Sequence, residues 1–164
     1  MTAMDTATTP HVGIRCASQT PSPEPDSKAD DAMIKDAIMN NETWAFTGGR
    51  DFADQAMFDD AMARLVGMFG CPSRVIHGAA RGLDTMAAAW AGRMAIPCVG
   101  VPADWGNQGR AAGPLRNEDI LRKYKPKRLI AFPGGRGTAD MVRRARNRNG
   151  EIEIIEIKPD QSHD

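Results

Sequence analysis

Residues 128–147 read RLIAFPGGRGTADMVRRARN, which is a short apolar run, a glycine-rich loop and a stretch of helical spacing in succession. The run Arg128–Phe132 carries little polar alternation and predicts a buried strand. Pro133 and the glycines after it end that strand. From about Thr138 to Asn147 the apolar residues recur at helical spacing. The segment therefore predicts a strand, a tight loop and a helix.

The same alternation extends over the chain from Trp44 onward. Other apolar runs lie at 44–47, 74–77, 96–101 and 152–157, and helical periodicity lies at 54–69, 83–94 and 115–124. Strands that alternate with helices imply parallel pairing. We predict an α/β fold, a Rossmann-like three-layer sandwich with a five-stranded, mainly parallel sheet in the order 3-2-1-4-5. The runs 74–77, 96–101 and 128–132 are expected to be covered on both faces, and 152–157 to be an edge strand.

Glycine is concentrated in the loops that follow the first four strands, which hold ten of the sixteen glycines. In an open α/β sheet, ligands bind at the carboxyl ends of the strands. Glycine there lets backbone N–H groups approach an anion closely. The loops after the first and fourth strands are expected to flank one crevice, because their connections run to opposite faces of the sheet.

These loops also carry Arg50, Arg81, Arg116 and Arg136, with Arg110 as a further arginine. Guanidinium groups bind phosphate or carboxylate oxygens in a bidentate manner. Arginines that converge on one rim repel one another unless an anion joins them. The spacing therefore predicts a ligand that carries phosphate.

Several polar residues near these loops allow two interpretations each. Asp51, Asp140 and Thr138 either cap helices or serve the ligand, and Asp84 either complements a helix dipole or binds a ribose or base edge. His77 is interpreted as a packed strand end rather than a catalytic base. Two residues are left for the pocket itself: Trp105 could stack on a base or seal the rim, and Asn117 could orient sugar or base.

Composition bounds the remaining possibilities. The 164 residues carry 21 basic and 21 acidic side chains, and 41% are hydrophobic, which is typical of a globular protein. No apolar run approaches the ~20 residues of a membrane helix. We therefore expect no membrane partner. Three cysteines and three histidines have no metal-ligand spacing, so we expect no metal, and we expect no cofactor. The cysteines also form no paired framework, which favours a cytoplasmic location.

Composition and charge divide the chain into a leader, a domain and a tail. Residues 1–42 are predicted to be a mostly disordered acidic leader with a short helix, because they are rich in Thr, Ser and Pro and carry a net charge of −4. Residues 43–158 form the predicted domain, with a net charge of +4 over 43–164. Residues 159–164 are a tail. The leader either is simply solvated or covers the basic site.

Four ordered motifs in this domain resemble one family. They are Thr47–Phe52, His77–Asp84, Pro102–Trp105 and Ala112–Asn117, and they look like the YspA-type, cpYpsA-related branch of the SLOG superfamily, which is named for Smf/DprA and Lonely Guy. The resemblance implies a Rossmann-like domain that binds nucleotides or nucleotide-derived ligands. It also implies a homo-oligomer.

Residues 133–138 also resemble the PGGxGT motif of the superfamily's phosphoribohydrolases, which split a nucleoside 5′-monophosphate. Their motif ends in a glutamate three residues after the threonine, and Met141 stands at that position here. Methionine can neither accept a proton nor balance a cationic transition state. Arg116, Glu118, Asp140 and Asp84 remain the candidates for a catalytic role.

Our preferred hypothesis is the binding of a small phosphorylated nucleotide or nucleotide-derived ligand. The alternatives are N-glycosidic hydrolysis of a nucleoside monophosphate and nucleic-acid binding by basic clusters at residues 122–128 and 143–148. The predicted ligand-binding residues are Thr47, Gly48, Gly49, Arg50, Gly78, Arg81, Gly82, Asp84, Arg116, Asn117, Pro133, Gly134, Gly135, Arg136, Gly137 and Thr138.

Overall fold

The computed structural model describes residues 41–159, and the predicted leader helix and most of the predicted tail lie outside them. Five parallel strands form one sheet in the order β3-β2-β1-β4-β5, as predicted. The strands are β1 (Thr43–Thr47), β2 (Arg74–His77), β3 (Cys98–Gly100), β4 (Arg128–Ala131) and β5 (Glu153–Glu156).

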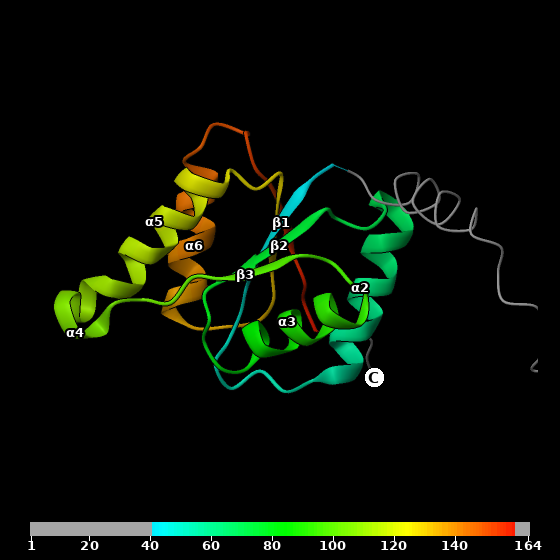
Figure 1. Ribbon diagram of the computed structural model, residues 1–164, viewed down its shortest axis with the longest axis horizontal. Helices are drawn as coiled ribbons and strands as arrows, with labels where there is room; N and C mark the ends of the chain where they lie inside the picture. The colour runs from blue at the N-terminus through cyan, green and yellow to red at the C-terminus, as the bar shows by residue number, and fades with distance from the viewer. Residues whose placement is uncertain (1–40, 160–164) are drawn as a thin grey trace, which may run out of the picture. The chain divides into compact units, whose positions relative to one another are not determined.

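Helices cover both faces of this sheet (Figure 1). The longer ones are α2 (Gln55–Phe69), α3 (Leu83–Arg93), α5 (Ala112–Tyr124) and α6 (Arg136–Arg146). Helices α2 and α3 pack on one face through a cluster that includes Trp44, Phe46 and Phe58. Helices α5 and α6 pack on the other through a second cluster that includes Ile76 and Leu129. The predicted three-layer α/β sandwich is confirmed.

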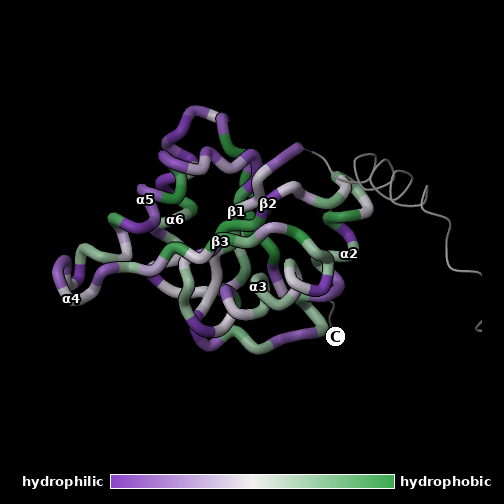
Figure 2. The backbone as a smooth tube through the Cα atoms, viewed as in Figure 1, coloured by the Kyte–Doolittle hydropathy of each residue, from purple (hydrophilic) through white to green (hydrophobic). Residues whose placement is uncertain are grey.

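Apolar side chains inside the two layers stabilise the domain. Figure 2 shows the hydrophobic segments gathered along the central strands, while the polar segments lie on the outer loops and helix faces. Trp44, Phe58 and Leu129 are fully buried. A buried side chain of this size contributes roughly 1.5–3 kcal/mol through removal of apolar surface from water. Because all five strands are parallel, the loops that follow them lie at one edge of the sheet.

One edge of the sheet differs from the sequence-based prediction. The run 96–101 was expected to be covered on both faces, but β3 is an edge strand, with Cys98 and Gly100 exposed. This exposure follows from the predicted strand order itself, which places β3 last on its side. The edge position predicted for 152–157 is confirmed by β5.

Local capping also differs from the sequence-based expectation. Helix α2 is capped by Asp54, whose carboxylate accepts a hydrogen bond from the Met57 amide at 2.9 Å, and not by Asp51. Helix α6 begins at Arg136 after Gly135, so Thr138 is not its N-cap.

The glycine-rich segment before α5 is more helical than predicted. It contains the short helix α4 (Trp105–Gln108) and the 3-10 turn η1 (Gly109–Ala111), and α5 begins at Ala112 rather than Leu115. Asp104 starts α4 by accepting a hydrogen bond from the Asn107 amide at 3.1 Å. The result is that Trp105 lies on a folded element next to α5.

Candidate functional site

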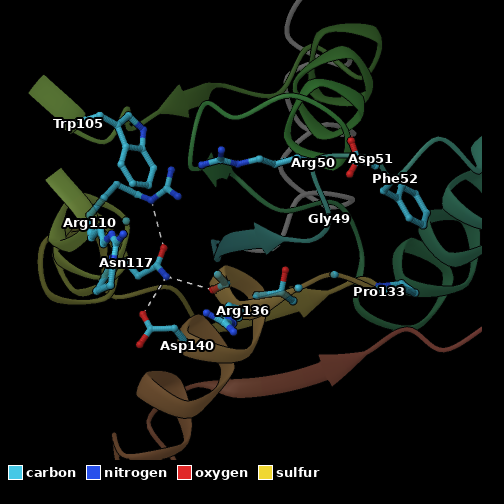
Figure 3. Close-up of a pocket in the computed structure, with 17 residues that line it drawn as sticks. Gly49, Arg50, Asp51, Phe52, Trp105, Arg110, Asn117, Pro133, Arg136 and Asp140 are labelled. Carbon is cyan, nitrogen blue, oxygen red and sulfur yellow. Dashed lines mark hydrogen bonds between the residues drawn. The ribbon is translucent and has the colours of Figure 1, made fainter.

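A cavity of about 790 Å³ opens at the carboxyl ends of β1 and β4 (Figure 3). This size lies within the range of about 300–1,000 Å³ that small-molecule sites occupy. The loop after β1, the loop after β4, and the α4–α5 segment form its walls. It is lined by Gly49, Arg50, Asp51, Phe52, Trp105, Arg110, Gly113, Pro114, Arg116, Asn117, Pro133, Gly134, Gly135, Arg136, Gly137, Thr138 and Asp140.

The two glycine-rich loops touch each other, as expected for loops that flank a switch point. The Gly49 amide donates a hydrogen bond to the Pro133 carbonyl at 2.9 Å. A side chain at Gly134 would come within 2.7 Å of the Gly49 backbone nitrogen and would also overlap Thr138. The close approach of the two backbones therefore requires glycine at position 134.

Two other glycines of the predicted site serve packing instead. Gly48 lies against Leu83, and a side chain there would overlap that leucine. Gly82 has a φ of 75°, and a Cβ there would come within 2.6 Å of the Arg50 carbonyl carbon. Neither lines the cavity, nor does Thr47 at the end of β1. Gly48 and Gly82 let the loop after β1 pack against the start of α3.

Arginines dominate the charge of the cavity. Arg50, Arg110, Arg116 and Arg136 line it, and within residues 41–159 none of the four forms an ion pair with a carboxylate. The guanidinium of Arg50 lies 5.3 Å from the centroid of the Trp105 ring. Figure 3 shows Arg50 extending from its loop toward Trp105. Four guanidinium groups that form no ion pair among these residues make this cavity attractive to an anion.

Arg116 is the most firmly held of the four. It donates hydrogen bonds to the carbonyl of Gly78, to the carbonyl of Val101 at 3.3 Å, and to the side-chain oxygen of Asn117 at 3.1 Å. Burial lowers the pKa of Arg116, the nearby Asp84 carboxylate opposes that shift, and the charge of Arg50 adds to it. The guanidinium is therefore fixed in place next to a second positive charge.

Asn117 connects this arginine to the acidic side of the cavity. Its amide nitrogen donates to the Gly137 carbonyl at 3.2 Å and to the Asp140 carboxylate at 3.1 Å, as the dashed lines in Figure 3 show. Partial burial alone would raise the pKa of Asp140, but hydrogen bonds from Arg144, Asn117 and Arg143 hold it below its usual value. Asp140 is therefore ionised, and its charge is already compensated.

Asp84 and His77 lie under the loop after β2 rather than in the cavity. Asp84 is 6% exposed and accepts a hydrogen bond from the Ala80 amide at 3.1 Å, and burial raises its pKa. His77 is 8% exposed, accepts from the Ala79 amide at 3.0 Å through Nδ1, and has a pKa lowered by burial. The two side chains thus bind the Ala79 and Ala80 amides of this loop, and Asp84 does not face the main cavity as predicted.

A second cavity of about 440 Å³ adjoins the first, and Arg50, Trp105 and Arg116 line both. Gly78 and Arg81 line it, and Arg81 forms an exposed ion pair with Asp51 at 3.3 Å. The structure therefore divides the predicted site between two neighbouring cavities.

The candidate catalytic carboxylates are placed unequally. Asp140 lines the main cavity, whereas Met141, at the position of the relatives' glutamate, is 1% exposed and packs in the core. Glu118 binds Arg144 and Arg148 between α5 and α6. Of these three residues only Asp140 reaches the cavity.

Sequence reasoning did not assign Phe52 and Pro114, which also line the main cavity. Both are neighbours of predicted site residues, but apolar side chains next to loops carry no pattern that separates a cavity wall from core. Phe52 packs against Phe132 with ring centroids 5.3 Å apart. It therefore serves both the core and the cavity wall.

The two basic clusters are largely neutralised by ion pairs. Arg122 and Lys123 pair with Asp119, and Arg146 pairs with Glu156. Arg128 is buried between Glu42 and Glu153. Of the nine basic side chains in the two clusters, Lys125 and Lys127 form no ion pair among the residues described by the structure.

Comparisons with known proteins fit this arrangement. Residues 45–107 match the YspA, cpYpsA-related SLOG family. The Gene 61 protein of Mycobacterium phage D29 is 36% identical over 106 residues, which is 60% of this chain and 84% of the phage protein. The chain belongs to this SLOG family. The match begins in β1 and ends in α4, so it contains Arg50 and Trp105. No solved structure matches the chain.

Membership of this SLOG family suggests a domain that binds nucleotide-related ligands. Within residues 41–159, no group of His, Cys, Asp and Glu could hold a metal ion. In the same part of the chain, no helix is long and apolar enough to cross a membrane.

Proposed function

We propose that this SLOG domain binds a small phosphorylated nucleotide or nucleotide-derived ligand in the cavity between the loops after β1 and β4. The observation that carries the proposal is the set of four arginines that line the cavity beside two glycine-rich loops and form no ion pair within residues 41–159. Helix α6 adds its N-terminus, where no side chain caps the first turn and no acidic residue lies in it. Backbone N–H groups at such a terminus favour an anion.

Each part of the cavity has a role in this proposal. Gly135, Arg136 and Gly137 would present amides and one guanidinium to a phosphate group. Arg116 would supply a fixed positive charge, because three acceptors already orient it. Trp105, which is 50% exposed, offers a ring face on which a base could stack.

The test is isothermal titration of the full chain with AMP, ADP-ribose, NAD and cyclic nucleotides, followed by Arg136→Ala. A guanidinium that bonds to phosphate contributes about 1.5–3 kcal/mol, so we expect the variant to bind at least about tenfold more weakly. Arg74→Ala is the matched control, because Arg74 is exposed, forms no ion pair among the described residues and lies at the opposite end of β2.

No binding across the panel would refute the proposal. Equal affinities of the Arg136→Ala and Arg74→Ala variants for a bound nucleotide would refute the assigned role of Arg136.

Hydrolysis of a nucleoside monophosphate has less support from the geometry. Asp140 is the one candidate carboxylate that lines the main cavity, and Arg143, Arg144 and Asn117 already bond to its oxygens. A general acid must hold a proton near neutral pH, and the lowered pKa of Asp140 opposes that. Release of ribose 5-phosphate from AMP at a rate that falls in an Asp140→Asn variant would restore this alternative.

Nucleic-acid binding also has less support, because ion pairs occupy most of the basic clusters. A steep fall of log affinity for single-stranded DNA with log salt would restore it. The homo-oligomeric state and the cytoplasmic location stay predictions.

A further inference from the structure

A chain of polar side chains joins α5 to α6 and ends in the main cavity. Asn117 and Glu118 lie on α5, and Asp140 and Arg144 lie on α6. The Arg144 Nε atom donates to the Asp140 carboxylate at 2.8 Å, and its Nη1 atom donates to the Glu118 carboxylate at 3.1 Å. Glu118 and Arg144 line neither the main cavity nor the second one. The chain of contacts therefore begins outside both cavities.

Arg116 is the cavity end of this chain, and its three guanidinium nitrogens are used unequally. Nε donates to the side-chain oxygen of Asn117 at 3.1 Å, and Nη1 donates to the Gly78 carbonyl and to the Val101 carbonyl. Within residues 41–159, Nη2 donates no hydrogen bond. Because the guanidinium group is planar and rigid, the bonds at Nε and Nη1 together fix the direction of Nη2. Nη2 is therefore the part of Arg116 left for an anion.

Asn117 sets the contact at Nε, and Asp140 sets the orientation of Asn117. Asn117 is buried, and its amide nitrogen donates to the Gly137 carbonyl at 3.2 Å and to the Asp140 carboxylate at 3.1 Å (Figure 3). A carbonyl and an ionised carboxylate can only accept hydrogen bonds. Turning the amide over would cost both bonds, so its oxygen faces Arg116.

Arg144 holds Asp140 more firmly than the other arginine that reaches this carboxylate. Arg143 donates to Oδ1 at 2.5 Å, but its side chain is exposed. Arg144 donates to Oδ2, which is also the oxygen that accepts from Asn117, and its side chain is 25% exposed. Partly buried ion pairs are screened less than exposed ones, and Glu118 restrains the other end of the Arg144 guanidinium. Loss of Arg144 would therefore free Asp140 to turn away from Asn117.

We propose that Arg144 is a positioning residue for ligand binding: through Asp140 and Asn117 it holds the Arg116 guanidinium in the direction that meets the anionic ligand. Arg144 does not touch the ligand itself. The consequence for binding rests on the proposed function, whereas the ordering of Arg116 is a property of the ligand-free protein.

The binding test compares Arg144→Met with Arg148→Met by isothermal titration with AMP, ADP-ribose and NAD. Arg148→Met is the matched control, because Arg148 also pairs with Glu118, its side chain is 27% exposed, and among the described residues it forms no ion pair with Asp140. Arg144→Met should weaken binding about three- to tenfold, the equivalent of one hydrogen bond. Arg148→Met removes the same charge and should change binding by less than about twofold, because a charge away from the cavity is screened.

Combination with Arg116→Ala separates positioning from a general effect of charge or stability. In that background Arg144 has no guanidinium left to position, so Arg144→Met should weaken binding no further. Equal losses in the two backgrounds would overturn the proposal. An equal loss in the Arg144→Met and Arg148→Met variants would overturn it as well.

Hydrogen exchange at the Arg116 Nε–H group, followed by NMR in the ligand-free protein, tests the ordering of Arg116 directly. The bond to Asn117 should slow this exchange, and Arg144→Met should speed it at least about threefold, whereas Arg148→Met should not. Unchanged exchange in folded Arg144→Met would show the proposal to be wrong, whether or not nucleotides bind. If exchange responds as expected but no nucleotide binds, the proposed function fails and the positioning of Arg116 by Arg144 stands. Arg144→Gln replaces Arg144→Met if thermal unfolding shows that methionine disrupts the fold.

Discussion

The contact between Gly78 and Arg116 gives the most informative perturbation of the site. Gly78 is not among the positive-φ glycines, so its backbone conformation is open to alanine. A Cβ at Gly78 would nevertheless overlap the guanidinium of Arg116 and lie 2.9 Å from its Nη2 atom. Because the obstructing atoms belong to the end of a long side chain, we expect Gly78→Ala to displace the guanidinium and leave the fold intact.

The size of the effect follows from the bonds that would be lost. Arg116 donates to the carbonyls of Gly78 and Val101, and Gly78 is buried. A buried carbonyl left without a donor costs about 1–3 kcal/mol, whereas the half-buried guanidinium regains water when it moves. We therefore expect Gly78→Ala to lower the free energy of unfolding by about 2 kcal/mol and to weaken nucleotide binding as much as Arg116→Ala does.

A double-mutant cycle in urea unfolding tests this reasoning. In an Arg116→Ala background the overlap is absent, so Gly78→Ala should change the free energy of unfolding by less than about 0.5 kcal/mol. Gly67→Ala is the control for a glycine substitution in open space, because no atom lies within 4 Å of its Cβ position inside α2. It should stabilise the protein by about 0.5–1 kcal/mol. Additive effects of the Gly78 and Arg116 substitutions would refute the proposed contact.

Three further predictions concern stability. Gly82→Ala should lower the free energy of unfolding in urea by about 3 kcal/mol or more, since Gly82 has a φ of 75° and faces the Arg50 carbonyl. A decrease of less than about 1 kcal/mol would contradict this prediction. The pKa of Asp140 is lower in the folded than in the unfolded protein, so its carboxylate stabilises the fold above the unfolded pKa near 4, and this stabilisation is lost as the pH falls through the folded pKa. Asp140→Asn should therefore flatten the loss of stability between about pH 5 and 3, and parallel curves of stability against pH for the two proteins would exclude this contribution. The lowered pKa of His77 favours the neutral ring, so stability should fall as pH drops below about 6.5, and His77→Asn should remove that dependence, as thermal unfolding from pH 8 to 5 would show.

Much of the fold was predictable because its signals are local. The β1, β2 and β4 runs are short and apolar, and each is followed by glycine and then by helical spacing. The predicted order 3-2-1-4-5, which is that of a Rossmann-like sheet, is the order observed. Helix α4 was missed because four residues in a glycine-rich run carry no periodicity, and its visible signal was the Asp104 cap.

The site was predictable in its loops and less so in its individual side chains. Arg50, Arg116 and Arg136 were expected to converge, and the structure brings them to one cavity. Asp84 was expected to be able to face a sugar, but it is buried under the loop after β2. A carboxylate in the first turn of a helix points toward the loop or toward the ligand depending on how that loop folds back, and sequence spacing does not specify this.

The amino-acid sequence by itself determined the α/β alternation, the edge of the sheet that carries glycine and arginine, and membership of the SLOG family. Only the tertiary structure decided that Gly48 and Gly82 serve packing, that Trp105 lines two adjoining cavities, and that ion pairs neutralise most of the basic clusters. The physical reason is the distance along the chain between the residues that interact. Strand and helix periodicity is set by neighbours along the chain, whereas the partners of an arginine or an amide come from segments far apart in sequence, and their positions depend on the packing of the whole domain.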